Sequence, residues 1–167
     1  MTNQLIKELF EEGNKFIQQQ KDPKIIVSQF NTFIQKNSQS YQLFIKSLEI
    51  SGCKHVSDGF FAFHGSSEAA VRSICENGFD PTKRQAKDGD YFGINSTTSG
   101  HPSYMKGGSN HMMLVFISSK KFNTVISGCC YRVNNPTDCS YSYCLPLFII
   151  SYGVNQPVTY LPPQLPL

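Results

Sequence analysis

The chain has 167 residues, of which 40% are hydrophobic, 13% aromatic and 16% charged, and its formal net charge is +3. This length suits one domain, or one domain with an appendage, and the composition excludes a disordered acidic chain and a charged coiled coil. The small positive excess, without a long Lys/Arg block, argues against nucleic acid as a partner.

The sequence also indicates a location in the cell. Residues 1–10 carry charged side chains and lack the apolar core of a signal peptide. The longest apolar run, residues 145–150, contains a proline and is far too short to span a bilayer. We therefore expect an intracellular protein, cytoplasmic or nuclear, without membrane contact.

Six cysteines occur at irregular spacing, which indicates free and mostly buried thiols rather than a disulfide framework. A zinc site is a weaker alternative, because the chain lacks a C-x2-C knuckle. Its ligands would be Cys129, Cys130, Cys139 and Cys144. No metal is expected.

Residues 1–56 show three apolar stripes at helical spacing and predict an N-terminal helical segment. Asp22-Pro23 separates the first stripe from the second, and Asn37-Ser38 separates the second from the third. Such stripes are typical of helices packed on a neighbouring core, so we expect this segment to lie against a domain of residues 57–167. A surface that binds a partner protein is the alternative. The second stripe consists of Ile26, Val27, Phe30, Phe33 and Ile34.

The most regular pattern follows from residue 60. Phe60 to Phe63 is a short apolar run that predicts a strand, and it ends on His64-Gly65-Ser66. A helix is predicted over Glu68 to Asn77, with Ser66 or Ser67 as its N-cap and Gly78 after its last turn.

Further along, apolar runs are separated by polar loops, one of which spans residues 95–108. Because the predicted strands do not alternate regularly with helices, the sequence predicts an α+β fold with largely antiparallel sheet. Strands are expected at Met112 to Ile117 and at Leu147 to Tyr152, and an ordered segment is expected to resume at Tyr91-Phe92.

No short motif in this chain indicates a function by itself. A single His-Gly is most often a turn, and a Tyr-Phe pair is most often part of a core. The sequence contains no Walker or Rossmann glycine loop, no G-x-S-x-G elbow and no H-E-x-x-H metal motif.

Taken in order, however, the motifs resemble the catalytic domain of the PARP-like, diphtheria-toxin-type ADP-ribosyltransferases. The resemblance covers residues 60–161 and implies that family's fold, two small and mainly antiparallel sheets around an NAD cleft. The matching segments are His64-Gly65-Ser66, Ile74 to Asp80, Gly89 to Phe92, Ser99 with Tyr104, Leu147 to Ile150, and Tyr160-Leu161.

The resemblance also implies how NAD⁺ would be held. The main chain of Gly65 would pair with the nicotinamide carboxamide, and Ser99 would donate a further hydrogen bond to it. Tyr91 and Tyr104 would stack on the nicotinamide ring. Two extra residues separate Ser99 from Tyr104 compared with the family pattern.

His64 and Ser66 would hold ribose hydroxyls, and the family's His-Tyr-Glu triad falls on His64, Tyr91 and Leu147. The chain is thus a variant without the triad glutamate. That glutamate orients an acceptor ribose during polymer formation, and a leucine has no atom that accepts a hydrogen bond. The resemblance therefore implies an NAD⁺-dependent mono-ADP-ribosyltransferase that modifies protein side chains, releases nicotinamide and uses no metal.

The sequence is also compatible with three other functions. The missing glutamate favours a catalytically silent module that binds NAD⁺ or ADP-ribose. Transfer to a nucleic acid would need a basic stripe beside the pocket, which the modest charge disfavours. A pure interaction protein would instead use the N-terminal helices.

Overall fold

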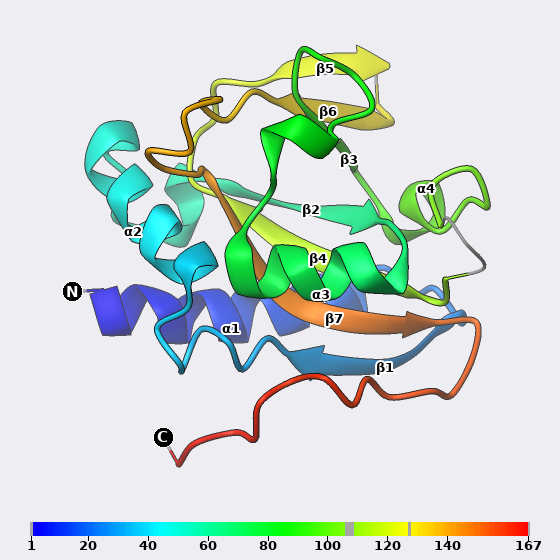
Figure 1. Ribbon diagram of the computed structural model, residues 1–167. Helices are drawn as coiled ribbons and strands as arrows, with labels where there is room; N and C mark the ends of the chain where they lie inside the picture. Colours follow the sequence, from blue (N-terminus) through cyan, green and yellow to red (C-terminus); the bar gives the residue numbers. More distant parts are fainter. Residues whose placement is uncertain (1, 106–108, 127, 167) are drawn as a thin grey trace.

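The computed structural model describes residues 2–105, 109–126 and 128–166, so residues 106–108 of the predicted polar loop lie outside the described part. It has an α+β fold in which helices pack on one antiparallel seven-stranded sheet (Figure 1). The strand order is β1-β7-β4-β2-β3-β6-β5. Among the described helices, none is long and apolar enough to cross a bilayer.

The strands are β1 (Ile25–Phe30), β2 (Phe60–Gly65), β3 (Asp90–Gly93), β4 (His111–Ile117), β5 (Asn123–Ile126), β6 (Cys130–Val133) and β7 (Cys144–Tyr152). The helices are α1 (Thr2–Gln19), α2 (Gln39–Ser51), α3 (Glu68–Asn77) and the short α4 (Ser96–Ser99). Single 3-10 turns occur at Val56–Asp58 and Pro81–Lys83.

The sheet consists of two parts that meet at one point. Strand β2 pairs with β4 along its whole length, from Phe60 to Gly65, but with β3 only at the pair Phe63 and Gly93. The two expected sheets are therefore joined into one, because this single antiparallel pair links the strands β1-β7-β4-β2 to the strands β3-β6-β5.

The structure confirms the predicted strand and helix that follow residue 60. Helix α3 begins after Ser67, whose side chain accepts a hydrogen bond from the Ala70 N–H, and it ends at Gly78 with φ of 91°. A residue other than glycine is strained at such a positive φ, so Gly78 stops the helix and redirects the chain.

The predicted second N-terminal helix was wrong, because residues 25–30 form strand β1. This strand pairs antiparallel with β7, and the Asn31 N–H after it donates to the Leu147 carbonyl at 2.9 Å. The β-branched run Ile25-Ile26-Val27 favours an extended chain. The few apolar residues of so short a segment do not distinguish the spacing of a helix from that of a strand. The N-terminal segment thus adds a strand to the sheet as well as the helices α1 and α2.

Helices α1 and α3 cover opposite faces of the sheet, with α1 behind it and α3 in front in Figure 1. Helix α1 approaches the sheet closely at Gly13, where an added methyl group would lie 2.8 Å from Cδ2 of Leu147. Helix α3 buries Val71 and Cys75 against the other face. The cavity described below lies on the α3 side.

Candidate functional site

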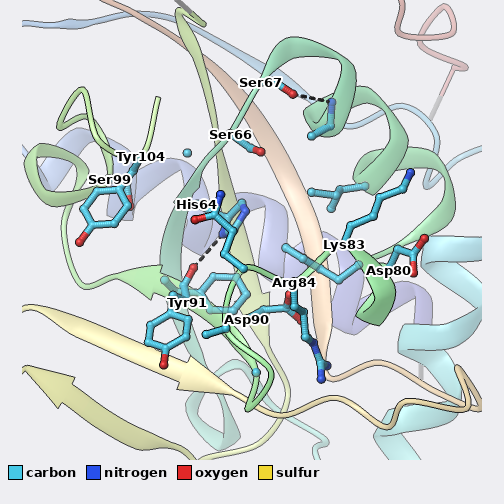
Figure 2. Close-up of a pocket in the computed structure, with 18 of the residues that line it drawn as sticks. His64, Ser66, Ser67, Asp80, Lys83, Arg84, Asp90, Tyr91, Ser99 and Tyr104 are labelled. Atoms are coloured by element: carbon cyan, nitrogen blue, oxygen red, sulfur yellow. Dashed lines mark hydrogen bonds and ion pairs between the residues drawn. The ribbon is translucent and has the colours of Figure 1, made fainter. Parts of the chain in front are cut away.

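A cavity of about 670 Å³ lies where α3, the end of β2, strand β3 and the α4 region meet. Its lining includes six of the seven site residues expected from the sequence, although they come from separate parts of the chain. Figure 2 shows Ser99 and Tyr104 on one side of His64, and Lys83 and Asp80 on the other. The six residues are His64, Gly65, Ser66, Tyr91, Ser99 and Tyr104.

His64 occupies the centre of the site, where burial favours its neutral form. Its Nδ1 lies 2.8 Å from the Tyr91 main-chain oxygen (Figure 2), and its ring packs against Phe79 and Phe92. Burial lowers the pKa of His64, an effect that the hydrogen bond to Tyr91 offsets only in part. Because a carbonyl oxygen only accepts, Nδ1 carries the proton and Nε2 is left as an acceptor.

Gly65 ends β2 against the turn that follows α4, and no other residue fits there. A methyl group at this position would lie 2.6 Å from the Ser99 main-chain oxygen and 3.3 Å from that of Tyr104. Since main-chain atoms cannot rotate away as a flexible side chain can, a glycine is required for this close approach.

Ser99 is nearly inaccessible, and its hydroxyl donates to the main-chain oxygen of Phe63 at 2.9 Å. The hydroxyl oxygen keeps the capacity to accept a hydrogen bond from a ligand. Gly93 makes this arrangement possible, because a methyl group there would lie 2.3 Å from the Ser99 Oγ. Sequence reasoning did not single out Gly93, although it follows the Tyr-Phe pair directly.

The two tyrosines have different surroundings. The Tyr91 hydroxyl donates to Asp88 at 3.1 Å, and Asp88 in turn pairs with Arg132 of β6. Tyr104 is 44% exposed and leans edge-on toward His101. Tyr104 is therefore accessible to a ligand from solvent, whereas the Tyr91 hydroxyl is held by Asp88.

Charged residues of the loop after α3 also line the cavity. The Arg84 side chain is 3% exposed; its Nε lies 3.4 Å from Asp90 Oδ2 and its Nη2 donates to the Asn135 carbonyl at 2.9 Å. Burial raises the pKa of Asp90, and the Arg84 guanidinium opposes that shift. The contacts of Arg84 thus fasten the loop to β3 through Asp90 and to the segment after β6 through Asn135. Lys83, which is next to Arg84 in the loop, also lines the cavity.

Leu147, the seventh expected residue, lies elsewhere. It is fully buried on β7 and faces α1, on the opposite side of the sheet from α3. Strand β7 pairs with β4 through Leu114 with Phe148 and through Val115 with Pro146, so Leu147 is the extra residue of a β-bulge. The bulge turns both Leu147 and Phe148 toward Gly13.

The cysteines are free, and four of the six are buried, which confirms the expectation for the thiols. Within residues 2–105, 109–126 and 128–166, no group of three or more His, Cys, Asp or Glu side chains could hold a metal ion.

The geometry suits a ligand that has a planar amide at one end and hydroxyl groups near the centre. A main-chain edge at Gly65 can pair with an amide, His64 Nε2 can accept from a hydroxyl, and Lys83 can attract an anionic group. Comparison of the chain with family models and with curated proteins gives no match.

Proposed function

We propose that this chain binds NAD⁺ in the cavity and transfers one ADP-ribose unit to a protein side chain. The observation that carries the proposal is that one cavity contains six residues which the resemblance had assigned to NAD⁺ from motif order alone. These residues span positions 64 to 104 of the sequence. The cavity volume of about 670 Å³ also falls within the range of roughly 300–1,000 Å³ found for small-molecule sites.

In the proposed complex, the carboxamide of nicotinamide pairs with the main chain at Gly65 and donates to the Ser99 Oγ. The neutral His64 accepts a ribose hydroxyl at Nε2, and Lys83 is placed to offset pyrophosphate charge. Cleavage of the bond between nicotinamide and ribose passes through an oxocarbenium-like state, as in glycoside hydrolysis. Nicotinamide leaves as a neutral molecule.

The acceptor in this proposal is a carboxylate on the target protein. Its oxygen forms the new bond to C1′ of the ribose as the bond to nicotinamide breaks, and no proton transfer is required. A carboxylate is already an anion at pH 7, so it needs no general base, in contrast to a ribose hydroxyl. The location of Leu147 in the core agrees with a reaction that uses no enzyme carboxylate at that position.

The same location of Leu147 favours a second candidate, a module that binds NAD⁺ without turning it over. Both candidates predict NAD⁺ binding, and they differ in whether label from NAD⁺ reaches a protein.

We expect discrete singly modified bands when the purified chain, NAD⁺ labelled in its phosphate and a cell lysate are incubated and run on a denaturing gel. Hydroxylamine, which cleaves esters, should remove the label. A high-mass smear that collapses under a polymer-specific hydrolase would contradict transfer of single units. An absence of label together with retained NAD⁺ binding would support the silent module.

Replacing Ala70 with tryptophan should abolish NAD⁺ binding without unfolding the chain. Ala70 is a half-buried residue of α3 that lines the cavity, so the larger side chain fills the ligand space rather than the core. NAD⁺ at 100 times its dissociation constant stabilises the folded state by about 2.7 kcal/mol. This corresponds to a rise in Tm of roughly 5–10 °C for the original chain and close to none for the variant.

The matched control is Asn77→Trp, an exposed position at the end of the same helix and not part of the lining. It should keep the full thermal shift. A full shift in Ala70→Trp would place the NAD⁺ site outside this cavity.

A further inference from the structure

Two adjacent cysteines lie at the edge of the cavity near Tyr104, and one of them, Cys130, lines it. Cys129 and Cys130 follow Gly128 in the β5–β6 hairpin, and their sulfur atoms lie 3.4 Å apart. Cys130 is 8% exposed and lines the cavity, whereas Cys129 is half-buried. A solvent-borne reagent therefore reaches Cys129 first.

The thiol pair is linked to the elements that shape the cavity. The Ile94 N–H donates to the Cys129 carbonyl at 2.8 Å, which ties the pair to the end of β3. The Cys129 sulfur lies 3.9 Å from Thr98 Oγ1, on α4. The Tyr104 side chain lies close enough to the Cys130 thiol to lower its pKa. Any displacement of Cys130 therefore changes the surroundings of Tyr104.

The Cys130 thiol is partly shielded, and the glycine before the pair is open to solvent. Burial, and then the neighbouring Cys129, raise the pKa of Cys130 to about 11, so Cys130 stays protonated at neutral pH. Gly128 is exposed at φ of 73°, and a methyl group there would meet nothing within 4 Å. The space beside Gly128 is therefore open on the side where a Cβ would point.

We propose that Cys129 and Cys130 are a redox-sensitive thiol pair, which hydrogen peroxide converts to a disulfide that reshapes the cavity. The Cys129 sulfur attacks one peroxide oxygen and the O–O bond breaks, which leaves a sulfenic acid on Cys129 and releases water. The Cys130 sulfur then attacks the Cys129 sulfur, and the S–O bond breaks with release of a second water. The two thiols lose two electrons and two protons, and the peroxide is reduced to two waters.

The bond requires the sulfurs to move from 3.4 Å to about 2.05 Å apart. Because Cys130 then turns toward Cys129, it withdraws from Tyr104, the residue expected to stack on nicotinamide. The disulfide should therefore weaken NAD⁺ binding. This second effect rests on the proposed function, whereas formation of the disulfide does not.

Digestion with trypsin isolates the pair, because residues 122–132 form one peptide that contains both thiols and no other cysteine. After treatment of the full chain with hydrogen peroxide and then iodoacetamide, mass spectrometry should find this peptide lighter by two hydrogens and unlabelled. Dithiothreitol should restore both labels. The exposed Cys139 is the internal control and should stay labelled. Peroxide-treated chain in which both thiols of the peptide still take the label, or in which the cysteines bridge two chains, would overturn the proposal.

Two readouts test the effect on the cavity. Oxidation should remove at least half of the NAD⁺ thermal shift, reversibly, and the double variant Cys129→Ser/Cys130→Ser should keep its shift under peroxide. Because the chain has no tryptophan, the emission of Ala70→Trp reports on the cavity without NAD⁺ and should change on oxidation. A disulfide that changes neither readout would overturn the link to the cavity. A changed emission in a chain that never binds NAD⁺ would support the link and reject the proposed function.

Discussion

Replacing Leu147 with glutamate is expected to lower the free energy of unfolding by about 3–5 kcal/mol, the cost typical of an unpaired buried charge. Leu147 is fully buried and contacts Gly13, so a carboxylate there has no water to solvate its charge and no space to move toward solvent. For a chain of this size the loss corresponds to a drop in Tm of roughly 6–20 °C, measurable by circular dichroism or calorimetry. The substitution therefore does not rebuild a catalytic triad.

The control is Leu147→Met, which conserves volume and should cost less than about 1.5 kcal/mol. A Leu147→Glu variant as stable as the original chain would mean that the side chain reaches solvent, contrary to the bulge in β7. In that case polymer synthesis by the variant becomes the decisive measurement.

Replacing Arg84 with methionine should cost about 3 kcal/mol at pH 7, because it leaves Asp90 charged and buried without its partner. The double variant Arg84→Met/Asp90→Asn should recover much of this loss, because it also removes the Asp90 charge, which the single variant leaves buried without a partner. Denaturant titrations of the two variants and the original chain measure both effects. Equal losses in the single and the double variant would show that Arg84 acts through its contacts with Asn135 alone.

The stability of Arg84→Met should also depend on pH in a defined direction. Burial already raises the pKa of Asp90 above its ordinary value of 3.8, and removal of Arg84 takes away the effect that lowers it. A carboxyl with a raised pKa in the folded state stabilises that state below its unfolded pKa and loses this contribution as pH rises through the folded pKa. The deficit of the variant relative to the original chain should therefore shrink as the pH falls from 7 toward the ordinary carboxyl value of 3.8. A deficit that grows toward pH 5 would contradict the assignment of Asp90.

Much of the local structure could be predicted from the sequence. The strand at β2 and the helix α3 followed from an apolar run, an N-cap serine and a glycine at the helix end, which all act within a few residues. The grouping of His64, Gly65 and Ser66 in one cavity wall also has a local cause, since the strand ends there and α3 begins.

Two contacts between distant segments were not predicted. Strand β1 was mistaken for a helix because its hydrogen-bonding partner, β7, lies more than a hundred residues further along the chain. The buried pair of Arg84 and Asp90 was missed for a related reason, because its burial depends on the segment around Asn135 after β6.

The sequence by itself determined the composition class, the α+β character and the order of the motifs, because these depend on short-range patterns of apolar and turn residues. Only the tertiary structure decided that the strands form one sheet, through the pairing of Phe63 with Gly93, and that Leu147 faces α1. A single extra residue in β7 reverses which face of the sheet a side chain meets, and this bulge exists only in the pairing of β7 with β4. The direction of a side chain in a strand is thus a property of strand pairing, which a linear motif does not contain.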